Sequence, residues 1–323
     1  MLLPPSDLPF RTTWTRGGCR PRLAWPTSRL RSGCDRHCTY CMIPRLRGRL
    51  RSRRMADIEQ ETRHLIAAGF KELVVIGQDT GCFGRDLNDG TRLSGLLERL
   101  AAISPDVWIR FLYGSPDTTD DDLIETMASH QNICAYFDIP VQHAASPVLK
   151  RMGRPYDKTD LVRLFDNIRR RIPDAALRTT LLTGFPGETD GDFEEMMEFV
   201  HRIQFDHLGV FVYSDDESLP SHRLSGHVPE KIATARQDRL MRAQQKLSAA
   251  KNQQYIGRIF PVLVEEALEP GLYAGRTMFQ APEVDGMVYV DAAGAAIGEV
   301  CDVRITDALE YDLRGEKISN KKR

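Results

Sequence analysis

The chain has 323 residues, of which 41% are hydrophobic and 28% charged, and its formal net charge is -1. This suits a globular protein of one large and one small domain, and no apolar run reaches the roughly 18 to 20 residues that a membrane span needs. Met1 to Leu8 lacks the apolar core of a signal peptide, so we expect a cytoplasmic protein whose seven cysteines are thiols or metal ligands rather than disulfides.

Between about residues 55 and 213, helical patterns alternate with short β-rich runs. The expected strands are 72–76, 107–113, 135–139, 177–182 and 207–213, and the expected helices are 57–68, 91–103, 119–129, 158–171 and 190–203. A sixth strand could precede the cysteine-rich segment that begins at Cys34. Strands that alternate with helices form a parallel sheet with right-handed crossovers. Six strands are too few to close an eight-stranded barrel, so we expect an α/β fold built as an open, partial (β/α)6 barrel.

The last third of the chain has a different pattern. Residues 229–255 predict a long polar connecting helix, and short strands separated by Gly-containing turns follow at 259–264, 272–275, 287–290 and 300–305. They predict a small OB-like all-β barrel over residues 251–318, after a core over residues 32–250. We interpret residues 1–31, which show no periodicity, as irregular, and residues 319–323 as a basic tail.

The strongest chemical signal is the segment Gly33-Cys34-Asp-Arg-His-Cys38-Thr-Tyr-Cys41. Three thiolates within eight residues can bind one face of a cuboidal [4Fe-4S] cluster and leave its fourth iron open to a ligand. An open coordination position is what a reactive metal site needs. A zinc site is the alternative, but it requires a fourth cysteine or histidine, and His37 lies between two of the cysteines. The other thiols are scattered and are expected to be ordinary buried side chains: Cys82, Cys134 and Cys301.

The spacing C-x3-C-x2-C, with Tyr40 before the last cysteine, resembles the signature of the radical S-adenosylmethionine (SAM) superfamily. Five further strings narrow the resemblance to the radical SAM methylthiotransferases, and among them to those that modify an aspartate of ribosomal protein S12. The strings are Cys41-Met-Ile-Pro-Arg-Leu-Arg-Gly48, Arg51-Ser-Arg53, Gly77-Gln-Asp-Thr80, Asp138-Ile-Pro-Val-Gln-His143 and Thr183-Gly-Phe-Pro-Gly-Glu-Thr189. The terminal barrel resembles a TRAM domain, so the similarity covers about residues 33–316.

The resemblance implies that Cys34, Cys38 and Cys41 bind one [4Fe-4S] cluster with SAM at its open iron. An electron donor would then trigger the release of a 5′-deoxyadenosyl radical, and the product would be a β-methylthiolated aspartate in the basic ribosomal protein S12 or in the small ribosomal subunit. Members of this family hold a second [4Fe-4S] cluster, the source of the sulfur, in an N-terminal domain with three more cysteines. Only Cys19 precedes Cys34 here, so the ligands of the second cluster are absent from this sequence, and residues 1–31 are interpreted as a remnant of that domain.

The expected SAM contacts follow from the resemblance and from the ends of the predicted strands, because ligands in such barrels lie at the carboxyl ends of strands. Gln142 follows the strand 135–139, whereas its neighbour His143 is more typical of a buried core histidine. The strand-to-helix turn 184–187 can present backbone N–H groups to a ligand or simply close a tight corner. The complete set of expected contacts is Tyr40, Gly77, Gln78, Asp79, Gln142, Gly184 and Gly187.

Charge is distributed unevenly along the chain. Residues 1–54 hold thirteen arginines against two aspartates, a balance of +11, and residues 252–318 hold five cationic and twelve anionic side chains, a balance of -7. Such runs often form no more than a solvated face. A tRNA methylthiotransferase, with the same chemistry, is the alternative function, but RNA binding favours a basic barrel and the acidic one favours a basic protein. An inactive remnant that only binds the ribosome is a third alternative.

Overall fold

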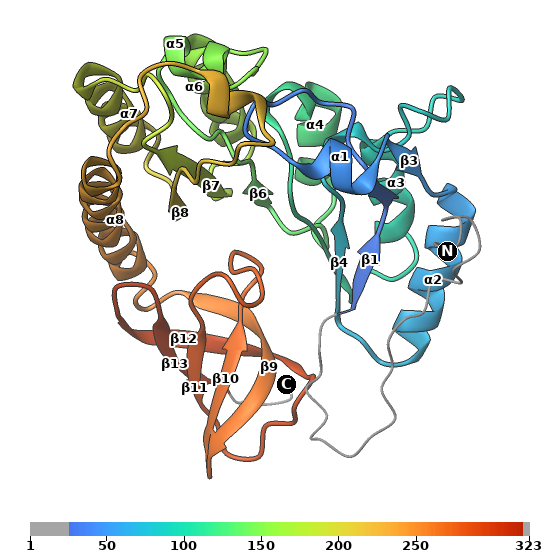
Figure 1. The fold of residues 1–323 in the computed structure, drawn as a ribbon. Coiled ribbons are helices and arrows are strands. Elements are labelled where there is room, and N and C mark those ends of the chain that lie inside the picture. Colours follow the sequence, from blue (N-terminus) through green and yellow to red (C-terminus); the bar gives the residue numbers. More distant parts are fainter. Residues whose placement is uncertain (1–25, 319–323) are drawn as a thin grey trace, which may run out of the picture.

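The computed structural model describes residues 26–318, which form an α/β part and a small β-barrel placed below it (Figure 1). Most of the predicted irregular segment 1–31, with Cys19, and the predicted tail 319–323 lie outside the described residues. Among residues 26–318, none of the helices combines the length and the apolar composition that a membrane crossing requires.

Six parallel strands form the α/β part, in the order β1, β4, β5, β6, β7 and β8. Two three-stranded sheets meet between β5 and β6, where the ladder is reduced to an isolated bridge between Ile109 and Ile133. The predicted open, partial barrel is confirmed. Its strands are β1 (Thr27–Arg29), β4 (Glu72–Ile76), β5 (Trp108–Phe111), β6 (Tyr136–Asp138), β7 (Ala176–Thr183) and β8 (His207–Val212).

The sixth strand, β1, lies directly before the cysteine loop, as the sequence suggested. It pairs with β4 from Thr27 to Arg29, so the core begins earlier than the predicted boundary at residue 32. The segment Thr27-Ser-Arg is short and polar, which hides its strand character. Burial of Ser28, whose hydroxyl donates to Glu61 on the following helix at 2.9 Å, fixes this strand against the helical layer.

Helices cover the outer face of this sheet because alternate side chains of each strand point outward. Leu73, Val75, Ile109 and Phe111 are buried there in one apolar cluster with the helices. The helices are α2 (Met55–Ala67), α3 (Leu93–Ala101), α4 (Asp121–Ser129), α5 (Ser146–Arg151), α6 (Lys158–Arg171), α7 (Asp190–Ile203) and the connecting α8 (Glu230–Gln253). Two short strands, β2 (Arg31–Ser32) and β3 (Arg51–Ser52), and the short helix α1 (Ile43–Arg47) flank the cysteine loop.

The C-terminal part is a closed five-stranded barrel with the strand order β10, β11, β13, β12 and β9, which confirms the predicted OB-like architecture. Its strands are β9 (Ile259–Glu269), β10 (Leu272–Arg276), β11 (Val288–Asp291), β12 (Val300–Ala308) and β13 (Leu313–Lys317). The sequence did not predict β13, whose residues are mostly polar and include Gly315. That glycine is required, because a Cβ there would lie 2.5 Å from the carbonyl oxygen of Arg304 on β12.

The two parts are joined at the amino ends of the sheet by a buried ion-pair chain. Glu72, at the start of β4, accepts hydrogen bonds from Arg110 of β5 and from Arg276 of the barrel, each at 2.6 Å. Burial alone would raise the pKa of Glu72, but the two guanidinium groups outweigh burial and hold it below its usual value. This carboxylate therefore stays charged and connects the sheet to the barrel.

A second link is made by the segment between β10 and β11, which projects from the barrel toward the sheet (Figure 1). Its Asp285 accepts a hydrogen bond from the buried hydroxyl of Tyr136 at 2.6 Å and forms an ion pair with Arg178 at 3.4 Å. The carbonyl of Phe279 accepts a hydrogen bond from the ring of His207 at 2.8 Å. Each of these partners lies near the amino end of its strand, so this segment closes the floor of the partial barrel.

We predict that Glu72→Gln destabilises the whole chain, because it leaves two buried guanidinium groups without their carboxylate. Removing one partner of a buried ion pair costs about 3–5 kcal/mol. The matched control is Asp291→Asn, which breaks the exposed pair with Arg314 and should cost at most about 1 kcal/mol. Denaturant unfolding measures both changes. Equal stability of the two variants would contradict the importance of this ion pair.

Candidate active site

The loop that carries Cys34, Cys38 and Cys41 crosses the carboxyl ends of the strands and is held from two sides. The N–H of Cys34 donates to the carbonyl of Gly48, just after α1, at 3.1 Å. On the other side, the N–H of Thr39 donates to the carbonyl of Met152 at 3.1 Å, at the end of α5. These bonds fix the backbone on either side of the thiols, so the loop is shaped by the protein itself.

The thiols of Cys34 and Cys38 are close enough to that of Cys41 to affect its ionisation. Burial, followed by the neighbouring thiols of Cys38 and Cys34, raises the pKa of Cys41 above its usual value. Within residues 26–318, no three His, Cys, Asp or Glu side chains converge on a site for a single metal ion. An iron–sulfur cluster makes a different demand, because each cysteine binds its own iron atom. Three neighbouring thiols on one preformed loop fit such a cluster.

Two arginines attach the cysteine loop to the end of β4. Arg31, only 2% exposed, donates to the carbonyls of Gly33 and Asp79, each at 2.7 Å. Arg36, between the first two cysteines, bonds the carboxylate of Asp79 at 2.5 Å and that of Asp117 at 2.9 Å. Asp79 therefore holds the loop in place. Its contact with SAM stays a prediction, and this structure gives it a positioning role as well.

Gln78 and Gln142 are the predicted SAM contacts with unusual features at strand ends. The side-chain oxygen of Gln78 is buried and has no hydrogen-bond partner among the described residues. Such an unsatisfied acceptor is rare in folded proteins and suits a ligand that donates a hydrogen bond. Gln142 has φ 72°, a left-handed conformation that is unfavourable for a side chain. Hydrogen bonds to Thr180 and from Leu182 on β7, at 2.9 and 2.8 Å, hold it there.

The turn 184–187 uses its backbone N–H groups inside the protein. The carboxylate of Glu188 accepts from the N–H of Gly184 at 2.7 Å, and the N–H of Gly187 donates to Gly226 at 2.7 Å. Arg236 of α8 pairs with the other oxygen of Glu188 at 2.7 Å. The Nε2 atom of the fully buried His143 lies 3.7 Å from the oxygen that accepts from Gly184. The closed-corner interpretation of Gly184 and Gly187 thus has direct support, and their contact with SAM stays a prediction. His143 lies in the core, as expected.

Tyr40 belongs to the cysteine loop and packs against the apolar cluster that contains Phe185. Its hydroxyl accepts a hydrogen bond from Arg154 at 2.5 Å, and its ring meets that of Phe185 edge-on with centroids 6.2 Å apart. Burial raises the pKa of the Tyr40 hydroxyl well above its usual value, so the group stays protonated. In this structure Tyr40 anchors the loop to the 184–188 turn, and its predicted role beside SAM is not tested by these contacts.

Sequence reasoning missed three residues at this edge of the sheet: Arg36, Glu188 and Tyr113. Arg36 stands within the cysteine loop, where its charge was a signal. Tyr113, after β5, has φ 63° and is 48% exposed, although tyrosine disfavours this conformation. Asp138 accepts its N–H at 2.9 Å. No sequence pattern predicts a left-handed tyrosine, because the strain is imposed by partners from other strands.

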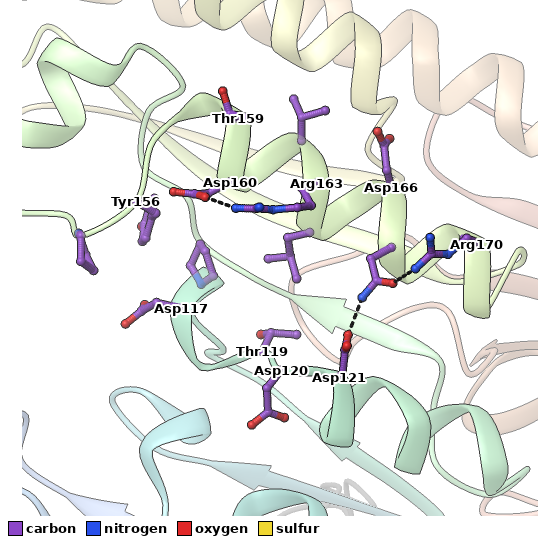
Figure 2. Close-up of a pocket in the computed structure, with 15 residues that line it drawn as sticks. Asp117, Thr119, Asp120, Asp121, Tyr156, Thr159, Asp160, Arg163, Asp166 and Arg170 are labelled. Atoms are coloured by element: carbon purple, nitrogen blue, oxygen red, sulfur yellow. Dashed lines mark hydrogen bonds and ion pairs between the residues drawn. The ribbon is translucent and has the colours of Figure 1, made fainter.

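Two cavities lie close to these residues. A cavity of about 260 Å³ adjoins the cysteine loop and is lined by Cys34, Arg31, Arg36, Arg85 and Cys82, among others. A larger groove of about 870 Å³ lies on the outer face between α4 and α6 (Figure 2). Among its acidic side chains, Asp120 caps α4, Asp160 belongs to the capping box of α6, and Asp117 pairs with Arg36 of the cysteine loop. The smaller cavity is the one that reaches the cysteine loop, through Cys34.

Comparison with known families identifies this arrangement. Residues 30–200 match the radical SAM superfamily and residues 256–318 match the TRAM domain. The ribosomal protein uS12 methylthiotransferase RimO of Desulfosudis oleivorans is 52% identical over 98% of this chain and 72% of its own length. The chain belongs to the radical SAM family of ribosomal protein uS12 methylthiotransferases. Members of this family use SAM and iron–sulfur clusters, so the cysteine loop lies where such chemistry is expected.

Other relatives extend this result. The RimO protein of Clostridioides difficile is 46% identical over 88% of this chain, which spans 65% of that relative's length. The chain thus spans about two thirds of the length of curated family members. Among solved structures, coproporphyrinogen III oxidase from Escherichia coli, a radical SAM enzyme, superposes with a TM-score of 0.51 at 15% identity, covering 79% of this chain and 67% of its own. This last similarity shows the radical SAM fold alone.

We predict that Gln142→Gly weakens SAM binding without destabilising the fold. Glycine accepts φ 72° without strain, so the substitution relieves the backbone while it removes the side chain. SAM affinity, measured by calorimetry on the cluster-loaded chain, should fall by about tenfold, the loss of one to two hydrogen bonds. The control is Gln204→Gly, at another left-handed position (φ 54°) at the end of α7. Unchanged SAM affinity in Gln142→Gly would remove Gln142 from the site.

Proposed function

We propose that this chain cleaves SAM at a [4Fe-4S] cluster on Cys34, Cys38 and Cys41, as part of β-methylthiolation of an aspartate in ribosomal protein uS12. The observation that carries the proposal is the preformed three-thiol loop at the carboxyl ends of the strands, in a chain 52% identical to a uS12 methylthiotransferase. Modification of a ribosomal protein would take place in the cytoplasm, the location that we expect from the sequence.

Each residue near the loop has a defined task in this proposal. When bound, the cluster supplies the electron that cleaves SAM. Gln78 offers its unpaired side-chain oxygen to the amino group of the methionyl part. Gln142 lies beyond the end of β6, where backbone hydrogen bonds to β7 hold it, and its side chain is proposed to contact SAM as well. Arg31 and Arg36 hold the cysteine loop against the end of β4 through their bonds to Asp79. The segment around Asp285 closes the opposite end of the barrel, so that substrate enters over the strand ends.

The sulfur-donating step needs ligands that these 323 residues do not contain, since Cys19 is the one cysteine before Cys34. SAM cleavage and sulfur insertion can therefore be separated with this chain. The first depends on the cysteine loop and the partial barrel, which are both described here. The second depends on a further cluster, whose ligands are not among these 323 residues.

We predict that the purified chain, after anaerobic reconstitution and reduction with dithionite, forms 5′-deoxyadenosine slowly but no methylthio-aspartate. About four irons should bind per chain. Replacing Cys34, Cys38 and Cys41 by Ala should abolish both iron binding and cleavage, whereas replacing Cys134 and Cys301, which are buried in other, apolar clusters, should leave both intact. Iron analysis and chromatography give the readouts. Retention of iron by the triple variant would refute the ligand assignment, and methylthio-aspartate made by this chain alone would refute the separation.

The acidic barrel supports a basic protein, and not RNA, as the substrate. Two of its charged groups, Asp285 and Arg276, form ion pairs with residues of the sheet. Asp291 and Glu299 pair with cations of the barrel itself. The exposed carboxylates that form no ion pair within the described residues are Glu266, Glu269, Glu283, Asp302, Asp307, Glu310 and Glu316. They would repel phosphate and attract lysine and arginine, over a screening length of about 8 Å at physiological salt.

We predict that the chain binds uS12 in a salt-sensitive manner and binds tRNA weakly or not at all. Charge reversal in the barrel (Glu266→Lys, Asp302→Lys and Glu316→Lys together) should slow association with uS12 by about tenfold or more. The control reverses three exposed acids of the α/β part, Glu98, Asp106 and Asp238, for the same change in net charge. Binding kinetics at two salt concentrations test this. Tighter binding to tRNA than to uS12 would favour the tRNA methylthiotransferase alternative.

A further inference from the structure

The segment that follows the cysteine loop is the most basic of the described chain. Arg45 to Arg54 contains six arginines and no acidic residue. Five of the six are exposed, and we call them the arginine surface: Arg45, Arg47, Arg49, Arg51 and Arg54. Among the described residues none of these five forms an ion pair, whereas Arg53 pairs with Glu61 at 2.6 Å. A merely solvated face usually mixes both signs of charge, and this one does not.

Carboxylates do lie beside the arginine surface, but they bind backbone instead of guanidinium groups. Asp35 accepts the N–H of Leu50 at 3.0 Å, and Asp86 accepts the N–H of Ser52 at 2.8 Å. They fix the turn between α1 and β3 and pair with none of the five arginines, of which Arg45 donates to the carbonyl of Ser218 at 2.6 Å. The backbone of this surface is therefore held in place, and no carboxylate neutralises its positive charge. Both properties suit a docking site for an anionic partner.

The arginine surface also lies directly over the cysteine loop. The N–H of Cys34 donates to Gly48, in the middle of this segment, at 3.1 Å. Gly33, at φ 74°, allows the approach, because a Cβ there would lie 2.0 Å from the carbonyl oxygen of Arg49. A partner seated on the arginines would be separated from the first cysteine by little more than one layer of backbone.

We propose that the arginine surface docks the acidic protein that delivers the electron to the cluster. The inference rests on the proposed function, which requires one-electron reduction. The donor is oxidised by one electron, the cluster is reduced by one electron, and no bond or proton is transferred in that step. Guanidinium groups bind carboxylates in bidentate fashion and steer an acidic partner toward the loop. Leu46, 67% exposed between Arg45 and Arg47, offers an apolar contact that suits a protein interface better than a phosphate backbone.

The test uses an acidic, FMN-containing flavodoxin as the probe and the full 323-residue chain, both with and without reconstituted iron. The variant is Arg47→Glu, Arg49→Glu and Arg51→Glu together. Its matched control is Arg63→Glu, Arg242→Glu and Lys246→Glu, which are exposed on α2 and α8 and change the net charge equally. Binding kinetics at two salt concentrations should show association slowed by about ten- to a hundredfold in the first variant, with the control close to the parent chain. Circular dichroism checks that both are folded.

Three outcomes would overturn the proposal. The two triple variants could lose binding equally, which would show an effect of net charge alone. The flavodoxin could bind the parent chain and the arginine variant with the same kinetics. A single-stranded RNA probe such as poly(U) could bind through the arginines while the flavodoxin does not, which would make the surface a nucleic-acid site.

Dithionite separates this proposal from the proposed function, because a small reductant needs no docking surface. The arginine variant should keep the dithionite-driven formation of 5′-deoxyadenosine of the parent chain and lose the flavodoxin-driven reaction. If the parent chain itself forms none with dithionite, the proposed function fails, and the binding kinetics of the iron-free chain still test the docking surface.

Discussion

The placement of the whole site depends on one buried carboxylate, that of Glu72. It lies at the amino end of β4 and is shared by an arginine of the neighbouring strand and an arginine of the C-terminal barrel. Charges buried in this way contribute little net stability, but they are costly in any other arrangement and so specify one orientation of the two parts. Because the barrel occupies the amino ends of the strands, the carboxyl ends are left for a ligand.

At the carboxyl ends of the strands, charged side chains position the cysteine loop and the 184–188 turn. Arg31 and Arg36 reach from the loop to Asp79, so the end of β4 positions the loop, which is shaped also by the hydrogen bond from the N–H of Cys41 to the carbonyl of Cys38. The Glu188 carboxylate does the same for the 184–188 turn, where Arg236 of α8 balances it. A loop and a turn that would otherwise be mobile are each pinned to a strand end by a buried acid.

Residues that act through local patterns could be predicted from the sequence. Three kinds of feature could be predicted because each depends on neighbours in the chain. They are the apolar runs of β4 and β7, the helix starts at Lys158 and Asp190, and the cysteine loop. Residues that act through distant partners could not be predicted. Tyr113 takes a left-handed conformation because Asp138 on the next strand accepts its N–H, and β13 becomes a strand because the barrel closes around Gly315. For the glycines at 184 and 187 the sequence left a ligand contact and a closed corner both open, because the partners of their N–H groups, Glu188 and Gly226, can be identified only in the folded chain.

The closure of the sheet by Arg276 and Asp285 has a consequence for biosynthesis. Strands β4 to β8 leave the ribosome before residues 276–285 do, and domains otherwise tend to fold in the order of their synthesis. Until the later segment is made, Glu72 has one of its two arginines, and Tyr136 and Arg178 lack Asp285. The nascent sheet therefore carries uncompensated charge on its floor, and its final packing must wait for the last fifth of the chain.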